Sequence, residues 1–447
     1  MPILRDHHLP LAPDWECKAT IDDNGIIQLA DPAIASLSTG DVRPNTWMLE
    51  VRYRATSRWK LPAVTIIDRS KSQATERFTQ YLEPNETGKR LINLTGIESL
   101  HQLQLTLKHL TLEGDATLLG FHNPNLASGA ILIIAPHPDD AELAAFGVYS
   151  QYPENTWIVT ITAGERLKRL DKQYWSGLDV SLEEASHRKG FIRAWNSATT
   201  PLLAGVPAER LVMLGYFNDT LTTLYEKPGT VAPSHSVPTL KPDAYRTWNK
   251  LSLPTDGQSR NTGQNLQSDL AALLASIKPK TIITPHPDLD PHADHIASTR
   301  HLQAATEQSG HYPENLMLYA NHLKSTRGFP RGPAHAAAGV WPTQASTQAP
   351  RNDKIASFPI SIEVQKQKAL ALHSMHDLGG TPGLERQLKR KLKRLLSGIP
   401  CKDWSDYSGH DFFQTHIKAH ENFVLRKIDQ TKSRGLEPLS GSQPLSK

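Results

Sequence analysis

Two clusters of histidine and aspartate contain the residue types that bind catalytic metal ions. The first, at residues 137–142, reads His-Pro-Asp-Asp-Ala-Glu, and the second, at 285–295, reads Pro-His-Pro-Asp-Leu-Asp-Pro-His-Ala-Asp-His. Imidazole and carboxylate groups are ligands of catalytic zinc, which takes three protein ligands and leaves one position for water. Since a bound metal ion activates this water and polarises a carbonyl group, the clusters indicate a metal-dependent hydrolase.

Each cluster directly follows a short apolar run of the strand type. Residues 131–135 read Ile-Leu-Ile-Ile-Ala, and residues 281–284 read Thr-Ile-Ile-Thr. In an open parallel sheet, ligands bind in the crevice at the carboxyl ends of the strands. A single histidine or aspartate in a loop is more often a capping or solvated group, so it is the pair of clusters that predicts one shared pocket.

The two clusters resemble the hallmark of a known family, the LmbE-like or PIG-L zinc de-N-acetylases. This hallmark is a strand followed by (Ala/Pro)-His-Pro-Asp-Asp-x-Glu and, later in the chain, His-x-Asp-His. Weaker similarities to the family lie at residues 162–165, 214–219 and 366–374. The resemblance covers roughly residues 130–380 and does not explain residues 1–125.

The resemblance implies a role for each residue of the clusters. The family's metal ligands correspond to His137, Asp140 and His295. Asp139 corresponds to the general base, which takes a proton from water and returns it to the departing amine. His292 corresponds to the positively charged or acidic partner that stabilises the oxyanion. Asp294 is expected to orient a neighbouring imidazole without binding the metal itself.

Two further residues are predicted to contact substrate. Asp219 ends the segment 214–219, and Arg188 lies in a helical stretch where the family has Arg-x-x-Glu. This chain has Phe191 where the glutamate is expected, so it departs from the family pattern there. The segment 286–288, His-Pro-Asp, repeats the start of the first cluster, and we interpret it as structural.

The metal itself has two candidates. Two imidazoles and one carboxylate suit zinc, but non-haem Fe²⁺ uses the same ligand set. Zinc is favoured because an aspartate next to a ligand serves hydrolysis and has no evident use in oxygen activation. The sequence lacks the G-x-S-x-G, P-loop, G-x-G-x-x-G, H-E-x-x-H and C-x-x-C motifs that would indicate other chemistries.

Composition excludes several other classes of protein. The chain has 447 residues, 38% of them hydrophobic and 21% charged, which is ordinary for a globular protein of two or three domains. Its net charge of +4 argues against nucleic acid as the main partner. It has no apolar run that could span a bilayer and no apolar signal segment. Cys17 and Cys401 form no disulfide framework, so we expect a reducing compartment, the cytoplasm.

The chain divides into three predicted parts. Residues 1–125 alternate apolar and polar positions in short runs, which predicts a β-sandwich. Residues 126–428 alternate strands and helices, which predicts an α/β fold with a Rossmann-like, mostly parallel sheet and helices on both faces. This part would be the deacetylase domain, and residues 429–447 a mobile tail. Strands are predicted at 131–135, 157–162, 210–214, 281–284 and 316–320, and helices are predicted to begin near Asp140, Leu182, Gln264, His295 and Ile362.

Three segments have two interpretations each. Residues 222–263, rich in Pro, Gly, Ser and Thr, form either a lid or a plain insertion. The sandwich either recognises a glycan, for which Trp47 and Trp59 are candidates, or stabilises or dimerises the protein. Residues 384–396 place five leucines on one helical face and contain six Lys or Arg. This helix either packs its leucines on the core or lies peripherally on an inner membrane surface with anionic lipids.

These observations predict a zinc-dependent hydrolase that removes the N-acetyl group from an amino sugar. The resemblance implies a GlcNAc-like sugar in a glycolipid, lipopolysaccharide or other envelope-glycan precursor. An amidase for a non-sugar or thiol-conjugate amide is the alternative, because the same ligand set serves any small amide. An inactive glycan-binding protein is the second alternative, and the intact Asp139, Asp140 and His295 argue against it.

Overall fold

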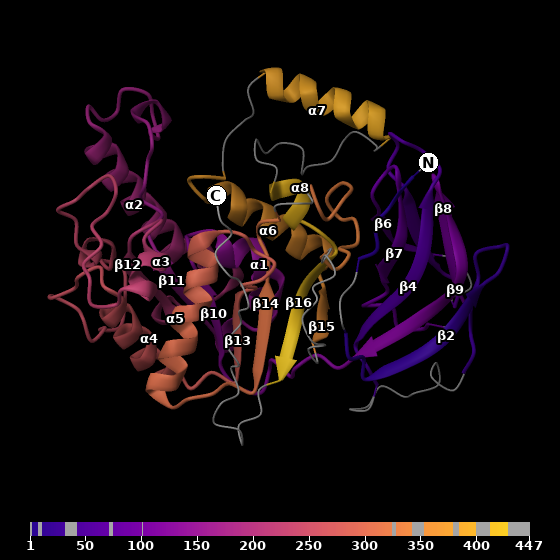
Figure 1. Cartoon of the computed structure of the whole chain (residues 1–447), viewed down its shortest axis with the longest axis horizontal. Helices are drawn as coiled ribbons and strands as arrows, with labels where there is room; N and C mark the ends of the chain where they lie inside the picture. Colours follow the sequence, from indigo (N-terminus) through magenta and orange to yellow (C-terminus); the bar gives the residue numbers. More distant parts are fainter. Residues whose placement is uncertain are drawn as a thin grey trace. The chain divides into compact units, whose positions relative to one another are not determined.

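The computed structural model of the chain contains two compact units that interleave along the sequence (Figure 1). The first comprises Met1–Pro124, Thr326–Ala369 and Leu378–Leu425, and the second comprises Asn125–Ser325, Leu370–Asp377 and Arg426–Lys447. The predicted division at residue 125 therefore does not describe the whole of either unit. The structure describes residues 2–7, 11–31, 43–70, 75–100, 102–323, 328–341, 353–378, 384–398 and 412–427. Cys401 and the predicted tail 429–447 lie outside these residues.

The first unit is built on two β-sheets. Its N-terminal strands are β1 (Ile3–Leu4), β2 (Trp15–Ile21), β3 (Ile27–Leu29), β4 (Thr46–Ala55), β5 (Ala63–Asp68), β6 (Thr75–Tyr81), β7 (Glu86–Asn93), β8 (Leu103–Lys108) and β9 (Leu110–Phe121). One sheet has the order β1-β7-β4-β9-β2-β3 and the other β6-β5-β8. Alternate residues of both sheets, such as Tyr53, Val64 and Leu105, are buried in one hydrophobic core. The predicted β-sandwich is confirmed.

Segments from the second half of the chain complete the first unit. They include β15 (Lys354–Pro359), β16 (His420–Lys427), α7 (Leu384–Ser397), α8 (Phe412–His416) and the start of α6 (Ile362–Ser374). Strands β15 and β16 pair antiparallel. The Nδ2 atom of Asn93 donates to the carbonyl of Ala338 and to Oγ of Ser357, both at 3.0 Å. Buried polar bonds of this kind attach the later segments to the sandwich.

The two tryptophans considered for glycan contact lie in different environments. Trp47 is buried in the sandwich core, where its ring meets the ring of Trp15 edge to face, with centroids 5.5 Å apart. Trp59 has 68% of its surface exposed. Of the two, Trp59 alone is accessible to a partner.

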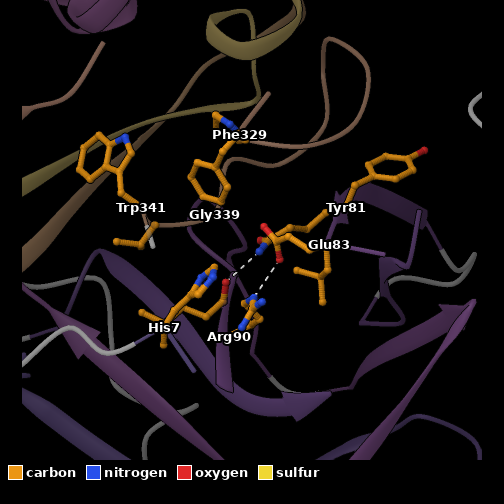
Figure 2. Close-up of a pocket in the computed structure, with 12 residues that line it drawn as sticks. His7, Tyr81, Glu83, Arg90, Phe329, Gly339 and Trp341 are labelled. Atoms are coloured by element: carbon orange, nitrogen blue, oxygen red, sulfur yellow. Dashed lines mark hydrogen bonds and ion pairs between the residues drawn. The ribbon is translucent and has the colours of Figure 1, made fainter. Parts of the chain in front are cut away.

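A small cavity of the first unit is lined by His7, Glu83 and Arg90, among others (Figure 2). Its volume of about 20 Å³ accommodates a water molecule or a single ion but no sugar ring. His7, Glu83 and Glu86 are close enough to share a metal ion. However, the guanidinium of Arg90 already pairs with both carboxylates, at 2.9 Å for Glu83 and 2.8 Å for Glu86. We therefore interpret this group as a buried ion-pair network.

The second unit contains a parallel sheet. Its strands are β10 (Ile131–Ala135), β11 (Thr156–Thr162), β12 (Leu211–Tyr216), β13 (Thr281–Pro285) and β14 (Asn315–Tyr319). They follow the order β12-β11-β10-β13-β14, and all neighbours are parallel. All five residues of β10 are buried, as expected of a strand covered on both faces. The predicted strands are confirmed, with bounds that differ by at most two residues.

Helices connect these strands in the predicted alternating pattern. They are α1 (Asp140–Gln151), α2 (Leu182–Thr199), α3 (Leu221–Glu226), α4 (Gly263–Ile277) and α5 (Ala293–Ser309). Because the strand order reverses at β10, right-handed crossovers place α1 and α2 on one face and α4 and α5 on the other. Helix α5 begins before the predicted start at His295, because the side chain of His292 caps it. Within the described residues, every helix is too short or too polar to cross a membrane.

The segment 222–263 belongs to the second unit and is anchored within it. Arg246 is buried, donates to the carbonyl of Leu214 at 2.9 Å and pairs with Asp269 at 2.9 Å. Tyr245, next to it, is fully buried. Such buried anchors favour the interpretation of this segment as an insertion over that of a lid.

Candidate active site

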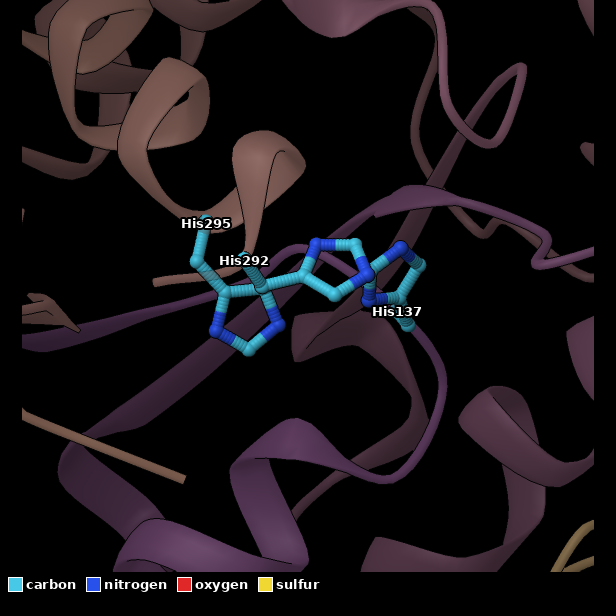
Figure 3. Close-up of side chains that lie close together, drawn as sticks. All are labelled: His137, His292 and His295. Carbon is cyan, nitrogen blue, oxygen red and sulfur yellow. The ribbon is translucent and has the colours of Figure 1, made fainter. Parts of the chain in front are cut away.

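The two histidine and aspartate clusters meet at one edge of the parallel sheet. Strands β10 and β13 are neighbours, and the strand order reverses at this point. His137 follows β10, and His292 and His295 follow β13. Their rings lie together, with centroids 4.9 Å apart both for His137 and His292 and for His292 and His295 (Figure 3). The site therefore occupies the switch point where open α/β sheets bind ligands.

One oxygen of Asp140 links the imidazoles of the two clusters. Its Oδ2 atom lies 3.3 Å from Nδ1 of His137 and 3.2 Å from Nε2 of His295. Donors of a tetrahedral zinc ion, with bonds of about 2.0–2.1 Å, lie about 3.3 Å from one another. Within the part of the chain that the structure describes, the buried Nε2 of His295 makes no well-aligned hydrogen bond, although Asp140 lies close to it. These atoms therefore fit the ligand set of a metal ion.

Two carboxylates hold these imidazoles from the opposite side. Nε2 of His137 lies 3.2 Å from Oδ2 of Asp294, and Nδ1 of His295 lies 2.9 Å from Oδ2 of Asp290. Each contact fixes the ring so that its other nitrogen faces Asp140. Asp294 was predicted to orient an imidazole, whereas Asp290 was missed. Its place in the second cluster was the available signal, but the sequence could not show which aspartate faces which ring.

The same carboxylates control the charge of the two rings. Burial alone would lower the pKa of His137, but Asp140 and Asp294 raise it to about 9. Burial likewise opposes a charge on His295, but Asp140 and Asp290 raise its pKa to about 10. A carboxylate behind a ligating imidazole increases its basicity, and this also strengthens its binding to a metal ion.

His292 offers a second way to complete the ligand set. The ligand atoms of His137, His292 and His295 lie within 4.8 Å of one another. We favour Asp140 as the third ligand because one of its oxygens lies within 3.3 Å of a nitrogen of each of the other two residues. Nδ1 of His292 accepts the backbone N–H of Asp294 at 3.2 Å. Burial and the neighbouring imidazoles lower the pKa of His292 to about 4, so a neutral ring with its proton on Nε2 is favoured over a charged one.

Asp139 lies next to this cluster in a strained backbone conformation. Its φ of 128° is unusual for a residue other than glycine, and such strain is frequent at functional sites. Its Oδ2 atom is 3.5 Å from Nη2 of Arg193. Burial raises the pKa of Asp139 to about 6; Arg193 opposes this shift, and the charge of Asp140 adds to it. Asp139 and Asp140 are thus adjacent in sequence but have different partners.

Arg193 of helix α2 is a site residue that the sequence did not reveal. Its side chain is buried, donates to the carbonyl of Pro138 at 2.8 Å and pairs with Asp377. It therefore holds the turn that carries Asp139. Within the helical pattern nothing distinguished Arg193 from other arginines, because its partners come from distant segments.

The two predicted substrate contacts lie in different places. Arg188 is exposed and binds Asp179 through two nitrogens, at 2.9 Å and 2.7 Å, so the structure does not bring it into the cluster. Asp219 pairs with Arg166, and its backbone N–H donates to Asp294 at 2.7 Å. Asp219 therefore lies at the edge of the cluster.

Asn218, which precedes Asp219, is a further residue that the sequence analysis did not identify. Its Nδ2 atom lies 3.2 Å from Nε2 of His137 and 3.2 Å from Oδ2 of Asp294. The segment 214–219 therefore supports the imidazole of His137, and this gives its similarity to the family a structural reason.

The fold and the cluster define the class of this part of the chain. It is an α/β domain that gathers imidazole and carboxylate donors at the switch point of a parallel sheet. Residues 132–306 match the model of the family described as PIG-L, GlcNAc-PI de-N-acetylase. This match supports the resemblance to the PIG-L family that the two motifs indicate. The curated proteins gave no match to the chain.

Several solved structures are similar to the chain, with low TM-scores and low sequence identity. The N,N'-diacetylchitobiose deacetylase of Pyrococcus horikoshii has a TM-score of 0.35 and 16% identity, over 67% of this chain and 84% of that one. A conserved protein of Thermus thermophilus has a TM-score of 0.31 and 18% identity, over 71% and 98%. The 4-carboxy-2-hydroxymuconate hydratase of Pseudomonas putida has a TM-score of 0.32 and 13% identity, over 66% and 95%.

Proposed function

We propose that this protein is a metal-dependent hydrolase that removes the N-acetyl group from a GlcNAc-like amino sugar. The observation that carries the proposal is the convergence of His137 and His295 on one oxygen of Asp140, beside Asp139, within a PIG-L domain. The description of the family as a GlcNAc-PI de-N-acetylase supports an N-acetylated sugar as substrate. We extend the proposal to a sugar carried by a glycolipid, lipopolysaccharide or other envelope-glycan precursor, and to a cytoplasmic location.

His137, Asp140 and His295 would hold the metal ion. The two short distances to Asp140 support this assignment. So does the buried Nε2 of His295, which makes no well-aligned hydrogen bond to any described residue. When bound, zinc would lower the pKa of a water molecule and polarise the amide carbonyl. Zinc is proposed over Fe²⁺ because Asp139 stands beside the ligands as a group that can move protons. Metal analysis of the purified protein distinguishes the two ions.

Asp139 would move the proton of the reaction. Its carboxylate accepts a proton from the water whose oxygen bonds to the carbonyl carbon. The same carboxyl group then gives the proton to the amide nitrogen as the carbon–nitrogen bond breaks, and acetate and a free amine result. Arg193 is proposed as a positioning residue, because it holds both the carboxylate of Asp139 and the carbonyl of Pro138.

His292 would stabilise the negative charge that develops on the carbonyl oxygen. Because its Nδ1 atom accepts the N–H of Asp294, a neutral His292 carries its proton on Nε2 and can donate it in a hydrogen bond. A donor that is fixed before the reaction stabilises such a charge most effectively. Asp294 would thus orient His137 through its side chain and His292 through its backbone.

The direct test is acetate release from a panel of N-acetylhexosamines, nucleotide sugars and lipopolysaccharide fragments. The purified, zinc-loaded protein is compared with a chelated sample and with the variant Asp139→Asn. Release that needs both zinc and Asp139 supports the proposal and ranks the substrates. No release from any sugar, with zinc shown to be bound, would contradict it. Cleavage of non-sugar amides alone would identify the amidase instead.

A further inference from the structure

Helix α7 exposes an apolar face. Its leucines recur at the spacing of one helical face, and each has at least half of its surface exposed. They are Leu384 (80% exposed), Leu388 (66%), Leu392 (58%), Leu395 (80%) and Leu396 (53%). In this structure the helix therefore does not pack its leucines on the core, and that interpretation is wrong. A contiguous exposed apolar face of this kind marks an interaction surface.

The same helix concentrates positive charge. Residues 384–396 contain six Lys or Arg and one Glu, so this helix accounts for more than the whole net charge of +4. Lys389 and Lys391 are both exposed. An apolar face combined with basic residues is complementary to a surface that presents both hydrocarbon and negative charge, which is a bilayer containing anionic lipid. A purely apolar or purely acidic partner would match only one of these features.

Trp59 lies in the loop next to the end of this helix. The backbone N–H of Leu61 donates to the carbonyl of Ser397, the last residue of α7, at 3.1 Å. Trp59 is 68% exposed, and the guanidinium of Arg58 lies 5.6 Å from its ring centroid. Tryptophan favours the boundary between hydrocarbon and head groups, and arginine favours anionic head groups. The loop therefore adds an aromatic and a basic side chain to the apolar and basic surface of the helix.

We propose that α7, together with the loop that carries Trp59, is a docking surface for an anionic lipid bilayer. The helix would lie parallel to the surface, with its leucines among the acyl chains and Lys389 and Lys391 among the head groups. This binding would be peripheral and reversible. The inference rests on the exposed leucines, the charge of the helix and the position of Trp59, and it does not depend on the proposed deacetylase reaction.

Co-sedimentation of the full-length protein with lipid vesicles tests this proposal. A chelator is present to remove bound metal ions. Vesicles of phosphatidylcholine alone are compared with vesicles that contain one-third phosphatidylglycerol. We expect binding to the anionic vesicles to be at least about tenfold tighter and to weaken as the salt concentration rises. Equal binding to both kinds of vesicle, or binding to neither, would overturn the proposal.

Paired substitutions connect the binding to helix α7. The double variant Leu388→Gln with Leu392→Gln should lose most of the binding to anionic vesicles. The matched control is Leu202→Gln with Leu203→Gln, which changes two leucines that are 44% and 58% exposed elsewhere in the chain. The control should bind as tightly as the wild type. Because all four leucines are exposed, both variants should keep the melting temperature of the wild type.

Two further measurements distinguish a bilayer from other partners of this face. Anionic vesicles should shift the tryptophan emission of the wild type to shorter wavelength. The corresponding shift in Trp59→Phe should be smaller. In sedimentation velocity, the Leu388→Gln with Leu392→Gln variant should have the same oligomeric state as the wild type. If these substitutions instead separated a dimer, the face would be an interface between two copies, and the membrane proposal would be wrong.

Discussion

Nε2 of His137 lies 3.2 Å from a carboxylate oxygen of Asp294, although the two residues are 157 positions apart in the chain. This contact turns the other nitrogen of His137 toward Asp140, at 3.3 Å. Asp290 does the same for His295. In the candidate metal site, one nitrogen of each imidazole thus contacts its own carboxylate, and the other nitrogen faces the shared Asp140.

Substitution of Asp290 should weaken metal binding without removing a proposed ligand. In Asp290→Asn, the ring of His295 loses the carboxylate at its Nδ1 atom but keeps Asp140, and we expect the zinc affinity to fall about 10–100-fold. Competition with a chromogenic chelator measures this affinity. Asp288→Asn is the matched control, because Asp288 belongs to the same segment but is exposed. Equal affinity in both variants would show that Asp290 does not support the site.

Substitution of Asp139 should separate metal binding from turnover. Asp139→Asn keeps the size of the side chain but cannot accept a proton, so we expect kcat to fall about 10²–10⁴-fold. The zinc content should stay at the wild-type level, because the proposed ligands are unchanged. Acetate release and elemental analysis measure the two quantities. Full activity in this variant would remove Asp139 from the role of base.

The two arginines of helix α2 should differ in their effect on activity. Arg193→Lys keeps the charge but loses the planar group that reaches both Pro138 and Asp377, and we expect a loss of about 10²-fold in kcat. Arg188→Lys changes an exposed residue that is paired with Asp179 and should leave kcat near the wild-type value. Steady-state kinetics and melting temperatures test this. A larger loss in the Arg188 variant would support its predicted contact with substrate.

Glu165 should make the stability of the protein depend on pH. Burial raises the pKa of this carboxyl group to about 7, from an ordinary value of 4.5. The folded state therefore binds more protons than the unfolded state between these values, so the contribution of Glu165 to stability decreases as the pH rises through this window. Relative to the wild type, Glu165→Gln should gain about 3 kcal/mol in unfolding free energy between pH 4 and pH 8. Denaturant unfolding at several pH values measures this gain, and a constant difference would contradict it.

Zinc should stabilise the folded protein through His295. A ligand that binds only the folded state at about 1,000 times its Kd adds about 4 kcal/mol to the unfolding free energy. Chelation should therefore lower the melting temperature of the wild type. His295→Ala should lose metal affinity, so its melting temperature should respond little to zinc or chelator. Scanning calorimetry with and without zinc provides the comparison, and an equal response in both proteins would argue against His295 as a ligand.

Much of the fold could be predicted because its signals are local. The buried run 131–135 is the observed strand β10, and the predicted helix start at Leu182 is the observed one. Helix α5 begins at Ala293, two residues before the predicted position, because His292 caps it, and the pattern of apolar positions does not mark this residue type. The interleaved units were missed for a different reason, since they depend on buried bonds such as that of Asn93 to Ser357.

By itself, the sequence determined the fold class of the second unit and the two clusters that supply donors to its sheet edge, because strand periodicity and position after a strand are local properties. Only the tertiary structure decided that Asp290 and Asp294 face different imidazoles, that Arg193 rather than Arg188 reaches Asp139, and that α7 exposes its leucines. These facts depend on the directions of side chains from distant segments. Packing fixes those directions, and no spacing along the chain encodes them.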